Sequence, residues 1–214
     1  MNILFFDATN DWLVVEIYNF TDTINLKHSL KGFFPRESSF RLVKEISIAL
    51  EKSEIEKPDL IIACNGPGSF TGIRICVSTA RNLAQIWNIP VVGINSIEFY
   101  CGYYFEKEKK SSIVLIEGGQ NKFFSAMMKE DRFDGCYDIS KEEVFNTFSV
   151  EKSNCNIYST QGKIENSKDI NSDIPGIQFF LKELLKRNIS LNEYNYNSLK
   201  PNYMRGTYAK EKKK

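Results

Sequence analysis

The sequence is poor in the residues that build metal and nucleophilic sites. Its 214 residues include a single histidine, His28, and five scattered cysteines without a C-x-x-C pair. A histidine- or cysteine-based metal site is therefore not expected, and Ser-His or Cys-His catalysis would depend on that one histidine. An odd number of irregularly spaced cysteines indicates reduced thiols rather than a disulfide framework, which leads us to expect a cytoplasmic location.

Long hydrophobic runs and an excess of one charge are also missing. The longest apolar runs, such as "SIVLIEGG", fall short of the roughly 20 residues that a membrane-spanning helix needs. The first residues lack the basic region of a signal peptide and soon reach Asp7. With a net charge of +1, the overall composition favours neither nucleic acid nor a membrane as the main partner.

Hydrophobic periodicity predicts a repeated order of elements. Apolar runs bounded by turn residues predict strands at 2–6, 12–18, 23–30, 60–64 and 89–94. A helical period predicts helices at 38–52, between the third and fourth strands, at 69–87, between the fourth and fifth, and from Ser96. Ser38 or Ser39 is the expected N-cap of the first helix. The polar stretch 106–112 is expected to be a linker or an exposed loop.

The same order recurs after that stretch. Strands are predicted at 113–117, 122–129, 132–137 and 154–159, a short helix after a capping box of Ser140 and Glu143, an amphipathic helix at 176–188, and a loop at 161–173. A β-β-β-α-β-α order that occurs twice predicts an α/β, actin-like (ASKHA), duplicated ribonuclease-H-like fold. We expect two mixed sheets with flanking helices and a shortened second domain.

Two domains follow from this repetition. The first is placed at residues 1–106 and carries the glycine-rich loop and the helices of an expected interface. The second, smaller domain is placed at 112–214, and its last residues are expected to pack back on the first domain.

The loop "GPGSFTG", residues 66–72, has the composition of a phosphate-binding loop. No lysine follows Gly72, so it is not a Walker loop, and its glycine spacing fits neither the dinucleotide fingerprint nor a nucleophile elbow. Two interpretations remain: an anion site at a helix N-terminus, or a structural turn capped by Ser69 or Thr71, which the pattern favours. The candidate residues of a vestigial nucleotide loop are Asp7, Thr9, Gly66, Gly68, Ser69, Thr71 and Gly72.

The helix that follows the loop is apolar on two sides. One stripe contains Ile73, Cys76, Val77, Ala80, Leu83, Ala84 and Trp87, and the other contains Ile75, Thr79, Asn82 and Ile86. A helix of this kind buries more than one side, either within its own domain or against another chain.

At these residues the sequence resembles the TsaB (YeaZ) family. The resemblance rests on "GPGSFTGIRICVSTARNLAQIWNIPVVGINSIE" (residues 66–98), on Asp7 followed by Thr9, and on "KPNYMR" near the end. It implies a non-catalytic subunit that binds and activates TsaD in bacterial synthesis of N6-threonylcarbamoyladenosine (t6A) at position 37 of tRNA, in a complex that TsaE joins. It also implies a heterodimer with TsaD, a homodimer when the chain is alone, and contact with tRNA only through the complex.

The resemblance also implies where partners and cofactors bind. ATP or ADP and metal are expected on the partner subunits or at the subunit junction, with none bound by this chain alone. The expected interface lies on the two N-terminal helices, at Leu42, Ile46, Ala49, Ile73, Arg74, Cys76, Val77 and Ala80. The chain departs from the family pattern at Ser38–Ser39 and at Glu117–Gly119, which puts a conserved polar site in the second domain in doubt.

An enzyme remains the alternative. A compact actin-like ATPase or small-molecule kinase would use Asp7 and the loop at 66–72. Binding of ATP and magnesium by the isolated chain would favour it.

Overall fold

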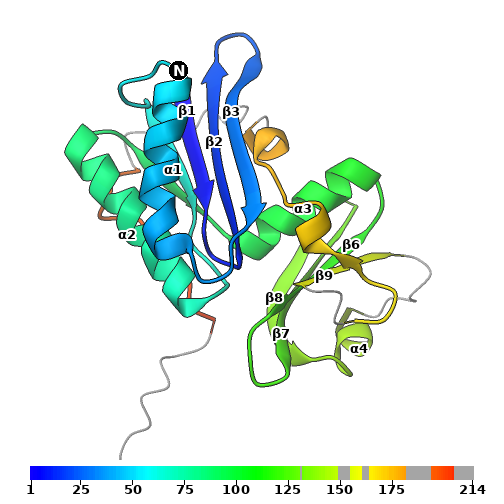
Figure 1. The fold of residues 1–214 in the computed structure, drawn as a ribbon. Helices are drawn as coiled ribbons and strands as arrows, with labels where there is room; N and C mark the ends of the chain where they lie inside the picture. Colours follow the sequence, from blue (N-terminus) through cyan, green and yellow to red (C-terminus); the bar gives the residue numbers. More distant parts are fainter. Residues whose placement is uncertain (131, 149–154, 161–163, 182–193, 205–214) are drawn as a thin grey trace, which may run out of the picture.

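Two sheets with the same strand order form the molecule (Figure 1). The computed structural model describes residues 1–130, 132–148, 155–160, 164–181 and 194–204. Arg205, the basic residues after it and most of the helix predicted at 176–188 lie outside these residues. Residues 178–181 are helical, as predicted.

The first sheet is mixed, with the order β3-β2-β1-β4-β5. Its strands are β1 (Asn2–Asp7), β2 (Trp12–Phe20), β3 (Ile24–Phe33), β4 (Leu60–Cys64) and β5 (Val91–Ile94). The helices α1 (Ser38–Lys52) and α2 (Phe70–Trp87) cover one face, and α3 (Ser96–Glu108) lies on the other. Because both faces are covered, β4 is apolar and buried along its whole length.

The second sheet repeats this connectivity in the order β10-β9-β6-β7-β8. Its strands are β6 (Ser112–Glu117), β7 (Lys122–Lys129), β8 (Arg132–Ser140), β9 (Asn156–Ser159) and β10 (Lys168–Asp169), with the short helix α4 (Val144–Phe148) between β8 and β9. An antiparallel meander followed by parallel strands thus occurs twice. This confirms the predicted duplicated fold.

One hydrophobic core joins the two sheets through α3. Tyr104 of α3 stacks on Tyr158 of β9, with ring centroids 3.6 Å apart. Glu16 on β2 is buried and accepts a hydrogen bond of 3.0 Å from the backbone N–H of Ile177. Lys31 compensates the buried charge at 3.3 Å from a Glu16 carboxylate oxygen. The boundaries 1–106 and 112–214 stay a prediction.

Three local predictions are corrected. The N-cap of α1 is Glu37, without a side-chain hydrogen bond, rather than Ser38 or Ser39. The stretch 106–112 is helical up to Glu108, because α3 continues past the predicted limit. The stretch 161–173 contains β10, which pairs with β9, and a 3-10 helix, Ile170–Ser172. Half of the predicted capping box is present: the Ser140 N–H donates to Glu143 Oε2 at 2.7 Å, whereas the Glu143 N–H donates to the carbonyl oxygen of Ser140 and α4 begins at Val144.

Residues 194–204, called here the return segment, pack against the first sheet. The Val91 N–H donates to the carbonyl oxygen of Tyr194 at 2.9 Å, and the Asn202 N–H donates to that of Asn65 at 2.7 Å. Leu199 between them is buried in the core under α1 and α2. In the described part of the chain, no helix has the length and hydrophobicity needed to span a membrane.

Candidate functional site

The glycine-rich loop is held by the backbone of the β1–β2 turn. The Ser69 N–H donates to the carbonyl oxygen of Thr9 at 2.6 Å, and Ser69 Oγ caps α2 by accepting from the Gly72 N–H. A Cβ atom on Gly68 would lie 2.3 Å from the oxygen of Thr9, and one on Gly72 would lie 2.3 Å from that of Ala8. These glycines are required because the chain's own backbone approaches so closely.

The Asp7 carboxylate is saturated with hydrogen bonds from within the chain. It is fully buried and accepts from the Thr9 N–H at 2.9 Å, from Thr9 Oγ1 at 2.7 Å, from Trp12 Nε1 at 3.0 Å and from the Tyr100 hydroxyl. Burial, and then the charge of Asp7, raise the pKa of Tyr100, so this hydroxyl stays protonated as a donor. A metal ion or phosphate at Asp7 would have to displace these partners.

The return segment closes the other side of the loop. Gly66 has a φ of +107°, which favours glycine, and a Cβ there would lie 2.6 Å from the carbonyl oxygen of Asn202. Its N–H donates to Ser96 Oγ at 3.1 Å, and its carbonyl oxygen accepts from the Ser96 N–H at 2.9 Å. The loop is therefore enclosed by the β1–β2 turn, by the start of α3 and by the return segment.

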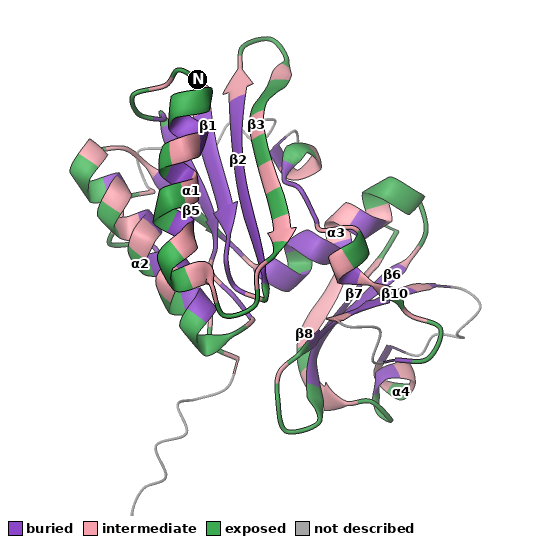
Figure 2. Cartoon of the chain, viewed as in Figure 1, coloured by how far each residue is buried: buried purple, intermediate pink, exposed green. Residues whose placement is uncertain are grey.

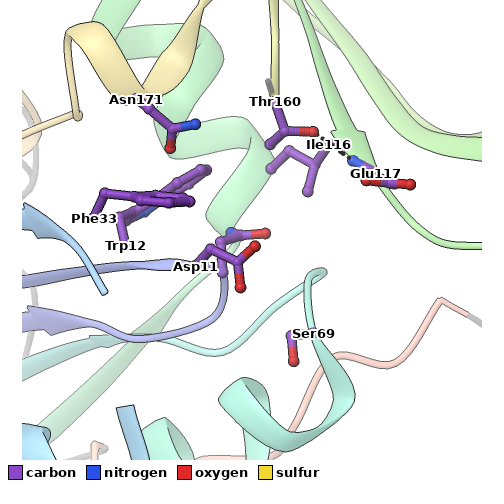
Figure 3. A pocket seen from close by; sticks show the side chains of 9 residues that line it. Asp11, Trp12, Phe33, Ser69, Ile116, Glu117, Thr160 and Asn171 are labelled. Atoms are coloured by element: carbon purple, nitrogen blue, oxygen red, sulfur yellow. Dashed lines mark hydrogen bonds between the residues drawn. The ribbon is translucent and has the colours of Figure 1, made fainter. Parts of the chain in front are cut away.

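A small cleft lies where the two sheets meet (Figure 3). Its volume is about 100 Å³, room for a few water molecules and far too little for a nucleotide. Asp11 and Glu117 contribute two carboxylates, and the lining holds no lysine or arginine. The described residues also contain no group of three or more His, Cys, Asp or Glu side chains placed to hold a metal. This cleft is therefore too small and too acidic for the polyphosphate of a nucleotide.

The residues predicted for a partner interface lie mostly inside the chain. Seven of the eight are buried beneath α1 and α2 and pack on the first sheet: Leu42, Ile46, Ala49, Ile73, Cys76, Val77 and Ala80. Arg74 is the exception and is exposed. These seven side chains cannot contact a partner in this conformation, because the apolar stripe chosen from the sequence is the one that covers the sheet.

The outer face of α1 and α2 nevertheless carries large apolar side chains. Phe40 and Val43 on α1 are 67% and 58% exposed, and Ile86 on α2 is 75% exposed. Figure 2 shows this exposed side of both helices facing away from the sheet. Ile86 belongs to the second stripe of α2, in which Ile75 is half-buried. We call Phe40, Val43, Ile75 and Ile86 the outer helix face.

Comparison with known proteins places the chain in a family. Residues 17–179 match the family model for TsaD, tRNA N6-adenosine threonylcarbamoyltransferase. The tRNA threonylcarbamoyladenosine biosynthesis protein TsaB of Buchnera aphidicola subsp. Schizaphis graminum is 29% identical over 115 residues, covering 53% of each chain. TsaB of Bacillus subtilis is 30% identical over 100 residues, covering 46% of this chain and 42% of its own. The chain belongs to the TsaB (YeaZ) family.

The fold of this TsaB-family chain is also that of a solved relative. The structure of YeaZ from Pseudomonas aeruginosa matches with a TM-score of 0.73 at 17% identity, over 95% of this chain and 99% of that one. The tRNA N6-adenosine threonylcarbamoyltransferase of Candida albicans is 32% identical over 111 residues, which cover 47% of this chain but 29% of the transferase. The chain thus spans about half or less of the length of these curated relatives.

The departures from the TsaB pattern lie at two surface turns. Glu117 ends β6, and Gly118 and Gly119 turn the chain into β7, with the Gly118 N–H bonded to the carbonyl oxygen of Lys122 at 2.9 Å. Ser38 and Ser39 form the first turn of α1. Both departures from the family pattern are confined to these short segments, and they leave the strand order of the two sheets unchanged.

Proposed function

We propose that this chain is a non-catalytic subunit in the cytoplasmic synthesis of t6A in tRNA, and that it binds and activates TsaD. The observation that carries this proposal is the outer helix face, where Phe40, Val43 and Ile86 leave large apolar areas in solvent. Exposed apolar surface of this kind is typical of protein–protein interaction sites. Membership of the TsaB family supports the pathway.

The proposal assigns no reaction to the chain itself. The groups that an ATPase of this fold would use are engaged within the chain: Asp7 by four donors and the Ser69 N–H by Thr9. The cleft between the sheets is small and lined with carboxylates, which disfavour a polyphosphate. We therefore infer that ATP or ADP and metal bind to the partner subunits or at the subunit junction.

Activation by binding alone is physically sufficient. A subunit that binds the active conformer of TsaD more tightly shifts the population toward it without supplying a catalytic group. A stable heterodimer would bury about 1,600 Å² in total, more than the three exposed apolar side chains provide, so polar neighbours on α1 and α2 must contribute. The same face would form the homodimer when TsaD is absent, and TsaE would join the TsaD complex.

Charge substitutions on the outer helix face test this interface. Val43→Asp and Ile86→Asp place a carboxylate on exposed positions, so the fold should persist, but burying an unpaired charge in the complex is costly. By calorimetry, we expect affinity for TsaD to fall by more than about tenfold. Leu26→Asp on β3, where Leu26 is 48% exposed, is the matched control. Undiminished binding by both helix variants would exclude this face.

The ATPase or kinase alternative makes the opposite prediction for the isolated chain. Titration with ATP and magnesium would show tight binding that is lost in Asp7→Ala. We expect no such binding, because the Asp7 carboxylate has no free position for a magnesium ligand.

A further inference from the structure

The helix α2 and the return segment pack against each other and contain no acidic residue. The whole chain has 27 aspartates and glutamates in 214 residues, so their absence from both elements makes this side of the molecule unusual in charge. Its cations are Arg74 and Arg81 on α2 and Lys200 on the return segment. Arg74 and Lys200 are exposed, and Arg81 is half-buried. We call these three residues the basic rim.

Arg74 is held at a fixed place in the basic rim. Its guanidinium carbon lies 3.9 Å from the centre of the Phe70 ring, and its Nε donates to the Tyr203 hydroxyl at 3.2 Å. Tyr203 follows Asn202, whose side-chain amide donates to the carbonyl oxygen of Gly66 at 3.3 Å. A cation that is already positioned in this way loses little conformational entropy when a partner binds.

The charges of the basic rim are not neutralised within the described part of the chain. None of the ion pairs formed there involves Arg74, Arg81 or Lys200. The helix α1 offers a contrast, because Arg41 pairs with glutamates on both sides of it along the chain. The two helices thus differ in charge: α1 carries both signs, whereas α2 carries positive charge alone. The net charge of +1 conceals this local excess.

The basic rim borders the outer helix face. Arg74 and Arg81 lie about two helical turns apart, on one side of α2. Ile75 follows Arg74 directly, and Ile86, which is 75% exposed, lies further along the same helix. An apolar centre with charged residues at its border, arginine among them, is the usual anatomy of a protein–protein interface.

A second copy of the chain does not complement the basic rim. In a two-fold symmetric dimer both partners use the same surface patch. Since α2 and the return segment have no carboxylate to offer, the positive charges of two copies would repel each other without compensation. A homodimer formed through the outer helix face is therefore weakened by the basic rim, and a different protein with acidic side chains is the better partner.

We propose that the basic rim steers the partner subunit into place by attracting carboxylates that border that subunit's apolar contact surface. This inference rests on the proposed function, since the partner is taken to be TsaD, and it adds the chemistry that TsaD must present opposite Arg74 and Arg81. Charges at the border of an interface act mainly on the association rate and its salt dependence, whereas most other interface contacts act on the dissociation rate. The basic rim and the outer helix face therefore have separable kinetic effects.

Association with TsaD, measured by surface plasmon resonance at several salt concentrations, tests the basic rim. Arg81→Glu and Arg74→Glu should each lower the association rate constant about fivefold at about 0.01 M salt, and the difference should shrink toward 1 M as charges are screened. Arg74→Lys keeps the charge and should keep the rate. The control is Lys27→Glu, an equal change of charge at an exposed lysine on β3, the edge strand opposite β5. Thermal unfolding shows that each variant is folded.

The outcomes separate this inference from the proposed function. Equal slowing by Lys27→Glu, or slowing that is the same at every salt concentration, would overturn the basic rim even if Ile86→Asp abolishes TsaD binding and so supports the interface. Failure of the unaltered chain to bind TsaD would overturn both.

Two further measurements cover other occupants of the basic rim. In sedimentation experiments on the chain alone, we expect any homodimer to tighten as salt is raised, because screening removes the repulsion. A homodimer that loosens with salt would assign the basic rim to a second copy. Variants that lose tRNA binding but associate with TsaD at the unaltered rate would assign it to nucleic acid, and either result would overturn the proposal.

Discussion

The Asp7 carboxylate illustrates how a buried acid is used for structure. Its donors come from Thr9, from Trp12 and from Tyr100, which lies 93 positions later on α3. The turn after β1, the second strand and the helix between the sheets are thereby tied to one buried charge. A carboxylate in this arrangement orders three elements and leaves no oxygen for a ligand.

Asp7→Asn should be strongly destabilising. An amide offers two donors where the protein presents only donors, so at least one buried N–H or O–H loses its acceptor. We expect the free energy of unfolding to fall by about 2 kcal/mol or more, measured by urea denaturation. Asp11→Asn, four residues further at an exposed position, should change it by less than about 0.5 kcal/mol. Equal stability of the two variants would refute the structural role.

The helix α2 has one face for the core and one for solvent. Ile73, Val77 and Ala80 are buried against the first sheet, whereas Ile86 is exposed on the second stripe. The close packing of the buried face follows from its small residues, and the loop that precedes it fixes where the helix begins. The two faces predict opposite results for the same substitution.

Val77→Asp should prevent folding, whereas Ile86→Asp should not. The first places an unpaired carboxylate in a dry core, at a cost of several kcal/mol, about the size of the total stability of many domains. The second leaves the charge in water. Circular dichroism melting curves of both variants would decide the matter, and a folded Val77→Asp protein would show that this face is accessible.

Much of the fold could be predicted because its patterns are local. Alternating apolar residues located the two meanders, and the glycine loop marked the start of α2. The choice between the two apolar stripes of α2 could not be made, since both have helical spacing and only the sheet beneath decides. The bond from Tyr100 to Asp7 escaped for a related reason, because it joins residues far apart in sequence. The sequence does predict that the last residues pack back on the first domain, but it does not single out Leu199 as the buried residue, because the return segment has no periodicity. The two-residue strand β10 is too short to leave a pattern.

Burial keeps all five thiols from ionising easily, although they lie in different parts of the core: Cys64 and Cys101 between the two sheets, Cys76 under α1 and α2, and Cys155 beside the second sheet. Burial raises the pKa of Cys64, Cys76, Cys101 and Cys155, and raises that of Cys136 to about 12. A raised pKa means that the folded protein holds each thiol proton more tightly than the unfolded chain does. This contribution to stability is complete below the unfolded thiol pKa of about 8.5 and is lost as pH rises above it.

Two measurements follow from these thiols. At about pH 8, Ellman's reagent should react slowly with the folded protein and rapidly with all five cysteines in denaturant. The urea midpoint should fall as pH is raised from about 8 toward 10, the direction set by the raised pKa values. Fast labelling of several cysteines in the native protein would contradict the burial of these thiols.

The most direct test of the account is reconstitution of t6A synthesis from purified components. TsaD, TsaE, ATP, threonylcarbamoyl-adenylate and unmodified tRNA are combined with and without this chain, and the chain is also tested with donor and tRNA alone. We expect t6A, quantified by mass spectrometry of the digested tRNA, only when TsaD and this chain are both present. Equal modification without the chain, or modification by the chain alone, would contradict its role as a non-catalytic activating subunit.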